Sequence, residues 1–139
     1  MDRAVSNRQP WIRAALLVGL VYFLVGRVFA VPGEHVQAWR LAAWLVSAVA
    51  YAAHIGYEHF RLRSSTRSTA LHVALAVAIG GFTLALAGMI HAASTPAGIR
   101  PVWFLALVAW PAFTAVPAFL GALVAAAILR RLPRSSELK

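Results

Sequence analysis

Four long apolar stretches alternate with short polar segments that carry arginine along the chain. The stretches without charged residues are 14–26, 41–57, 68–99 and 101–129. The apolar core of a bilayer is about 30 Å thick, so a helix that rises about 1.5 Å per residue needs about 20 apolar residues to cross it. The pattern predicts four membrane-spanning helices, at about 11–31, 38–59, 69–93 and 101–129.

The first of these helices is the shortest in apolar length. It can span a bilayer only if Arg13 and Arg27 extend their guanidinium groups to the two membrane interfaces. The apolar run from Ala14 to Val25, followed by the small-residue pattern Val28-Phe29-Ala30, also matches a secretory signal peptide with its cleavage site. Arg27 directly before that site, and Trp11 as an interface anchor, favour a helix that is not cleaved.

Composition supports a membrane protein. The 139 residues are 61% hydrophobic and 12% charged, whereas an ordinary soluble domain has about 45–50% apolar and about 25% charged residues. These values exclude a disordered chain and disfavour a water-soluble globule. We expect an all-α fold in which residues 1–139 form one four-helix transmembrane bundle, with 133–139 as a flexible cytoplasmic tail.

The positions of the cations predict the orientation. Of the 13 Lys and Arg residues, all but Arg27, Arg40 and Arg100 lie before or at the start of the first span, between the second and third, or after the fourth. Cytoplasmic segments next to spans collect Lys and Arg, which predicts an N-in/C-in protein, with both termini cytoplasmic, in a bacterial cytoplasmic membrane. The net charge of +9 then serves topology and contacts with lipid headgroups, and no nucleic-acid partner is expected.

A polar stripe marks one face of the second predicted helix. Its residues recur at intervals of three and four, and at about 100° per residue they lie within an arc of about 80°. They are Arg40, Trp44, Ser47, Tyr51, His54 and Glu58. Because an ionisable side chain near the bilayer centre costs about 2.5–3.5 kcal/mol, we expect this stripe to face the bundle interior, a cavity or a partner chain.

The second and third spans are antiparallel, which places His54, Glu58 and His72 at a similar depth near the cytoplasmic side. We interpret this layer as a route or sensor for a small solute or a proton, formed by Ser47, Tyr51, His54, Glu58 and His72. Because four spans rarely enclose a path alone, this function requires a homo-oligomer or a larger membrane complex. The alternative for the stripe is a hydrogen-bonded seam between helices.

A second polar layer is expected at the opposite membrane face, and it comprises Arg27, Glu34, His35, Arg40, His91 and Arg100. Two histidine layers allow an alternative function, a haem b-binding redox subunit whose axial ligands are the His54/His72 and His35/His91 pairs. A divalent metal ion held by His54, Glu58 and His72 is a further option. In a third interpretation, the chain is a structural assembly subunit and its histidines only bond to nearby polar groups.

Nothing in the sequence indicates an enzyme, and we assign no catalytic residue. Phosphate-binding glycine loops, nucleophile elbows and HExxH pairs are absent, and we recognise no family motif. Glu34 and Glu58 are predicted at opposite membrane faces, so they cannot act as paired acid and base. Without cysteine, disulfides and thiolate chemistry are excluded.

Small residues and prolines predict how the helices pack. Pro111 and Pro117 each remove a backbone hydrogen bond from the fourth span, so that helix should be kinked, either as a hinge or as a static bend. Glycines on three spans should allow close approach of backbones, within the chain or in a dimer. They are Gly19, Gly26, Gly80, Gly81, Gly88 and Gly121.

Overall fold

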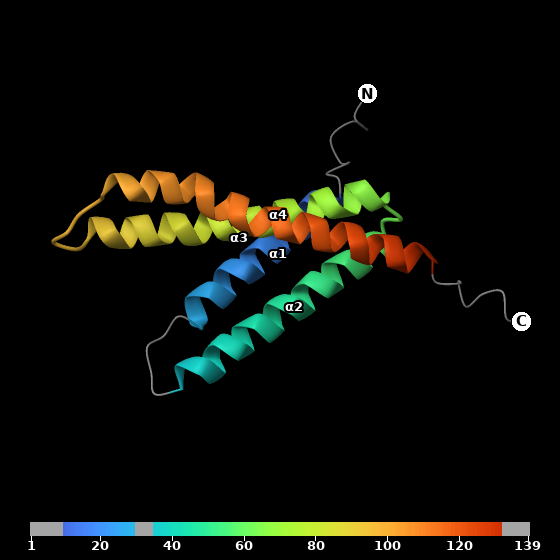
Figure 1. The fold of residues 1–139 in the computed structure, drawn as a ribbon, viewed down its shortest axis with the longest axis horizontal. Helices are drawn as coiled ribbons and strands as arrows, with labels where there is room; N and C mark the ends of the chain where they lie inside the picture. The colour runs from blue at the N-terminus through green and yellow to red at the C-terminus, as the bar shows by residue number, and fades with distance from the viewer. Residues whose placement is uncertain (1–9, 30–34, 132–139) are drawn as a thin grey trace, which may run out of the picture.

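The computed structural model is all-helical and describes residues 10–29 and 35–131 (Figure 1). Its four helices are α1 (Pro10–Val28), α2 (Val36–Phe60), α3 (Thr66–Ala93) and α4 (Pro101–Arg131). The predicted all-α fold and the existence of all four helices are confirmed. The predicted tail at 133–139, the proposed cleavage after Ala30, and Glu34 fall outside the described residues.

Three of the helices, α1, α3 and α4, are long and apolar enough to cross a membrane. α2 has 25 residues, which is also long enough, but polar residues along one face make it less apolar than the others. The predicted fourth span therefore depends on whether the other helices bury those polar residues.

The helices form two antiparallel hairpins, α1–α2 and α3–α4, which lie together at one end and spread apart at the other (Figure 1). α3 and α4 run side by side, and α1 crosses and packs against α3. We call the first region, where α1 and α3 begin and α2 and α4 end, the converging end. The opposite region is the open end.

The buried core is small and lies towards the converging end. Ile55 of α2, Ala70 and Val73 of α3, and Ala122 of α4 form its central cluster. By contrast, large apolar side chains elsewhere are exposed, including Phe113 at 78% and Trp44 at 77%. An apolar surface of this extent is typical of a protein that lies in a bilayer or binds a partner.

Glycines permit the close packing of α1 on α3. A Cβ atom added at Gly80 would lie 2.6 Å from the Cβ of Tyr22, and one at Gly19 would lie 2.8 Å from Ile79 Cγ2. Gly81 similarly faces the Thr114 hydroxyl of α4, at 2.9 Å. The close approaches predicted from small residues are confirmed within the chain.

α4 continues as one helix through Pro111 and Pro117, and its two halves run in different directions (Figure 1). Thr114 lies between the prolines and bonds to the carbonyls of Trp110 at 3.0 Å and Pro111 at 3.1 Å. A threonine hydroxyl of this kind competes with the backbone for carbonyl oxygens and adds to the bend. The predicted kink is therefore present.

Candidate functional site

A completely buried carboxylate lies at the converging end. Glu58, in the last turn of α2, has 0% exposure. Its Oε1 atom is 3.0 Å from His72 Nδ1 of α3, and its Oε2 atom accepts a hydrogen bond from Ser64 Oγ at 2.6 Å. Burial of a carboxylate without partners is strongly unfavourable, so these two contacts allow Glu58 to occupy this position.

His54 lies one turn before Glu58 on α2 and is also buried, at 2% exposure. Its Nε2 atom is 3.8 Å from Glu58 Oε1, which is beyond hydrogen-bond distance. Neither of its ring nitrogens has a hydrogen-bond partner among the described residues. A buried polar group in this state is unusual, and the nearest acceptor to this imidazole is the Glu58 carboxylate at 3.8 Å.

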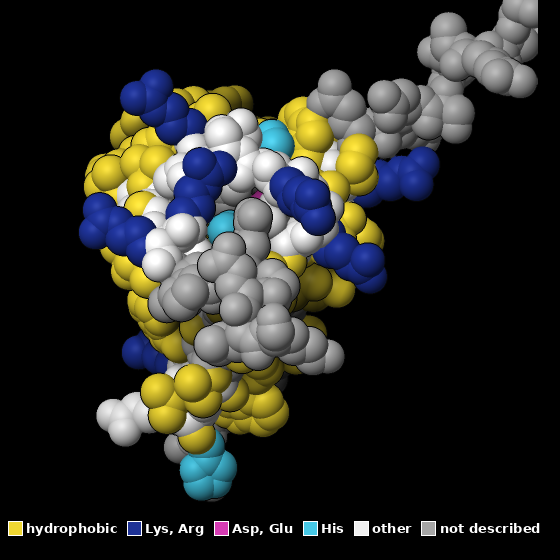
Figure 2. Space-filling view, turned by 90° about the vertical axis from the view of Figure 1, so that its right-hand side faces the viewer, with side chains coloured by type: hydrophobic (Ala, Val, Ile, Leu, Met, Phe, Trp, Pro, Cys, Tyr) yellow, Lys and Arg dark blue, Asp and Glu magenta, His cyan; other side chains and the backbone are white. Residues whose placement is uncertain are grey.

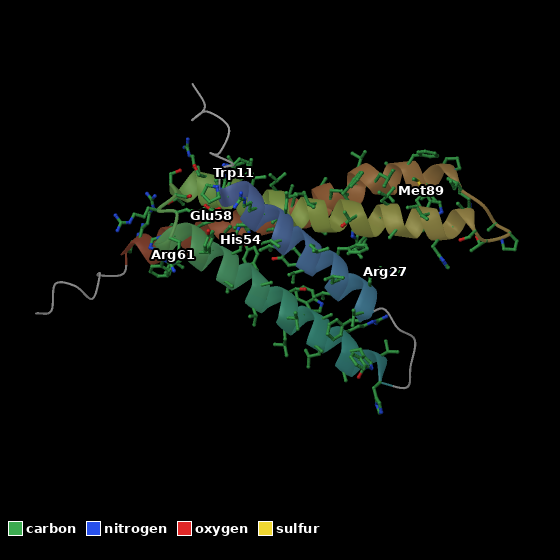
Figure 3. The ribbon with its side chains drawn as sticks, turned by 180° about the vertical axis from the view of Figure 1, so that it is seen from behind. Trp11, Arg27, His54, Glu58, Arg61 and Met89 are labelled. Carbon is green, nitrogen blue, oxygen red and sulfur yellow. The ribbon has the colours of Figure 1, made fainter. Side chains whose placement is uncertain are left out.

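Trp11 stacks on the ring of His72. The two rings stack with centroids 4.3 Å apart and planes 4° from parallel. Trp11 comes from the start of α1, beside Glu58 and His54 (Figure 3). The side chain of His72 keeps 19% exposure, so His72 is the member of the cluster that solvent can reach.

The α2–α3 connection closes over Glu58. Ser64 donates its backbone N–H to the carbonyl of Glu58 at 3.1 Å, in addition to its hydroxyl bond, and Arg63 adopts a left-handed φ of 51°. Arg130 of α4 donates to the Ser64 carbonyl at 3.0 Å. Contacts with Trp11, His72 and Arg130 thus link the carboxylate of α2 to the other three helices.

The structure brings together three of the five residues predicted to form the polar layer. We call His54, Glu58 and His72 the His–Glu–His cluster. Tyr51 instead donates its hydroxyl to the Ala118 carbonyl of α4 at 2.5 Å. The side chain of Ser47 makes no hydrogen bond to other described residues. The predicted line from Ser47 to His72 is therefore not a continuous chain of hydrogen bonds.

Tyr51 is a packing residue as well as a hydrogen-bond donor. A Cβ atom added at Gly121 would lie 2.8 Å from the Tyr51 hydroxyl oxygen, so the absence of a side chain at Gly121 makes room for the phenol. Tyr51 also packs against the buried cluster around Val73. Its contacts join α2 to α4, which is the seam that the sequence offered as the alternative to a pathway.

The residues predicted to form an outer-face cluster lie on two separate hairpins. Arg27, His35 and Arg40 belong to α1–α2, and His91 and Arg100 belong to α3–α4 and its connection. The hairpins spread apart at this end, as the labelled positions of Arg27 and Met89 indicate (Figure 3). The structure therefore does not gather these residues into one site.

The geometry also bears on metal and haem binding. No group of three His, Asp or Glu side chains within 10–29 and 35–131 is arranged to hold a metal ion. In the His–Glu–His cluster, Glu58 Oε1 is 3.0 Å from His72 Nδ1 and 3.8 Å from His54 Nε2, so the carboxylate oxygen contacts the His72 ring directly. Two axial histidines would also need space for a haem between them, whereas here the Glu58 carboxylate lies close to both imidazoles.

Sequence reasoning did not assign Trp11, Ser64 and Arg130 to the site. Trp11 is an aromatic residue at the start of a span, and this position indicated an interface anchor rather than a contact with His72. Ser64 reaches Glu58 through the path of the connection, and Arg130 reaches Ser64 from the end of α4. Neither contact follows from periodicity. Comparisons of the chain with protein-family models, curated proteins and solved structures found no match.

Proposed function

We propose that this chain is a helical integral membrane protein that senses protons through the His–Glu–His cluster. The observation that carries the proposal is Glu58, a carboxylate with 0% exposure that lies within 3.0 Å of one imidazole and 3.8 Å of another. Histidine is the side chain whose charge ordinarily changes in the physiological pH range. A carboxylate shared by two such groups responds directly to that change.

The membrane placement is supported by three apolar helices and by the exposed apolar surface. α2 can act as a fourth span because His54 and Glu58, its most polar inward residues, are buried by protein rather than by lipid. Arginines are concentrated at the converging end, which supports a cytoplasmic location for that end and an N-in/C-in topology.

The contacts around the cluster indicate how binding of a proton would alter the packing of the helices. Uptake of a proton by His54 would place a positive charge 3.8 Å from Glu58 Oε1 and draw the carboxylate towards it. Movement of the carboxylate would weaken its bonds to His72 and Ser64. Those residues contact Trp11 of α1 and Arg130 of α4, so the change would reach every helix.

Sensing fits the geometry better than conduction does. A route for a solute or proton through Ser47 and Tyr51 would have to break the bond from Tyr51 to the Ala118 carbonyl, and it would also require a homo-oligomer or a larger membrane complex. The haem alternative would require Glu58 to leave the space between His54 and His72. We therefore keep these functions, and that of an assembly subunit, as outcomes of the test.

The test uses Trp11 as the reporter. The other tryptophans, Trp39, Trp44, Trp103 and Trp110, are replaced by Phe, and the protein is reconstituted in lipid nanodiscs. A protonated imidazole stacked on an indole quenches its fluorescence, so emission should fall as the pH is lowered from about 8 to about 5.

Two variants and a control define the outcome. His72→Gln should abolish the fall in emission, and Glu58→Gln should alter it because the carboxylate that lies 3.0 Å from His72 and 3.8 Å from His54 is removed. His59→Gln is the control, since His59 contacts Phe60 edge-on, at 4.8 Å between ring centroids, and forms no hydrogen bond, ion pair or ring contact with the cluster among the described residues. An emission that is independent of pH, or unchanged by Glu58→Gln, would refute proton sensing.

A further inference from the structure

The converging end carries a band of exposed arginines that the His–Glu–His cluster does not use. Figure 2 looks onto this end and shows basic side chains around a central area where histidines are visible. The described members come from α1, α3, α4 and the α2–α3 connection, and all are exposed. We call them the arginine rim: Arg13, Arg61, Arg63, Arg67, Arg130 and Arg131.

The charge of the arginine rim is not neutralised by the described part of the protein. Glu58 is the only acidic residue within 10–29 and 35–131, and it is buried and bonded to His72 and Ser64. Arg130 donates to a backbone carbonyl, and none of the rim guanidinium groups forms an ion pair with a described residue. Like charges gathered on one surface repel, so an anionic partner would stabilise this arrangement.

Apolar side chains lie directly beside the arginine rim. Ile12 neighbours Arg13 on α1, Phe60 ends α2 directly before Arg61, and Ile128 lies less than one turn before Arg131 on α4. Their exposures are 41%, 69% and 55%. A surface that is basic at the end of the helices and apolar along their sides matches a phospholipid, which has its phosphate above its acyl chains. Nucleic acid or an acidic protein would engage the basic part alone.

We propose that the arginine rim binds the headgroups of anionic phospholipids at the converging end. This inference depends on the membrane placement under the proposed function, but not on proton sensing. Guanidinium groups bind phosphate oxygens in a bidentate manner, and rim arginines on different helices would be joined by the same lipid layer. The lipid would therefore bind most strongly where α2, α3 and α4 meet.

The experiment measures the lipid preference at Trp11. The protein with Trp11 as its only tryptophan is reconstituted into phosphatidylcholine vesicles that contain brominated phosphatidylglycerol or, in parallel, brominated phosphatidylcholine. Bromine quenches an indole only at short range, so quenching reports lipid at the converging end. Both leaflets have the same composition, so the direction of insertion does not affect the result.

Two matched variants each remove three charges. Arg61→Gln, Arg67→Gln and Arg131→Gln change the arginine rim, while Arg27→Gln, Arg40→Gln and Arg100→Gln change the other end. Each basic residue near an anionic surface contributes about fivefold in affinity, so we expect phosphatidylglycerol to quench at a lower mole fraction than phosphatidylcholine by about fivefold or more. The rim variant should lose this preference and the matched variant should keep it.

A Lys version of the rim variant checks that folding is intact, because it should keep most of the preference through charge alone. High salt should weaken the preference, since interactions of exposed charges are screened. Equal quenching by the two lipids, or the same loss in both Gln variants, would overturn the inference. Tighter binding of duplex DNA than of phosphatidylglycerol would also overturn it. If the protein cannot be reconstituted into any bilayer, the membrane placement itself fails.

Discussion

Glu58 is the residue whose replacement should have the largest local effect. In Glu58→Ala, the His72 imidazole and the Ser64 hydroxyl lose the carboxylate that they contact at 3.0 and 2.6 Å. A hydrogen bond to a charged group contributes about 1.5–3 kcal/mol, so the free energy of unfolding should fall by an amount in that range. Glu58→Gln should lose less, because an amide can still accept one bond and donate another.

Reversible unfolding in mixed detergent micelles, followed by circular dichroism, measures both variants. Ser64→Ala provides a comparison that removes only the hydroxyl bond and should fall between wild type and Glu58→Ala. Equal stability of Glu58→Ala and Glu58→Gln would mean that the bonds to this carboxylate do not contribute to folding, and that the cluster is not a structural joint.

At the residue scale, local spacing explains what could be predicted. His54 and Glu58 are four residues apart on a helix, which places them on one face, and antiparallel spans bring His72 to the same depth. The stack of Trp11 on His72 could not be predicted, because it depends on how α1 is rotated against α3. The bonds of Ser64 depend on the left-handed conformation of Arg63, which hydropathy does not encode.

At the element scale, Gly80 tests the packing of α1 on α3. In Gly80→Ala, the new Cβ would meet the Tyr22 Cβ at 2.6 Å, and backbone-linked atoms cannot turn aside as the end of a flexible side chain can. Overpacking of this kind costs about 1–3 kcal/mol, so we expect the unfolding free energy to drop within that range.

Gly56→Ala is the matched control on α2. The nearest atom to its added Cβ is Phe60 Cδ2 at 4.0 Å, which is an ordinary contact. Alanine is favoured over glycine inside a helix by about 1 kcal/mol, so this variant should be neutral or slightly more stable. If Gly80→Ala matches Gly56→Ala in the same unfolding assay, the close contact of α1 with α3 is not formed.

Hydropathy predicted the helices well because each apolar run must be long enough to cross a bilayer. The boundaries at Pro10, Thr66 and Pro101 agree with the predictions to within a few residues. The spread of the two hairpins could not be predicted, because crossing angles depend on which side chains interlock. As a result, His35 and His91, which the sequence placed at one level, belong to separate hairpins.

At the scale of the whole molecule, topology is open to a direct test because the chain contains no cysteine. Single cysteines introduced at Ser65, in the α2–α3 connection, and at Ala97, in the α3–α4 connection, are both at exposed positions. In intact bacterial cells, a membrane-impermeant maleimide should label Ala97→Cys and not Ser65→Cys. Labelling of both from outside the cell would contradict the N-in/C-in proposal.

The two hairpins diverge from the converging end towards the open end. The His–Glu–His cluster joins them at the converging end, and the separation is greatest at the open end (Figure 1). A small rearrangement around Glu58 would therefore produce its largest displacement at the open end. Spin labels on Gln37→Cys at the start of α2 and Ala97→Cys after α3 report this separation by pulsed electron resonance.

We expect the distribution of this distance to differ between about pH 8 and about pH 5, over the range in which histidine changes its charge. Glu58→Gln removes the carboxylate that His54 would attract, so the distribution in that variant should no longer change with pH. His59→Gln should respond as the wild type does. If the distance is the same at both pH values in the wild type, the cluster is a static joint, and proton binding at Glu58 and its histidines has no consequence for the arrangement of the hairpins.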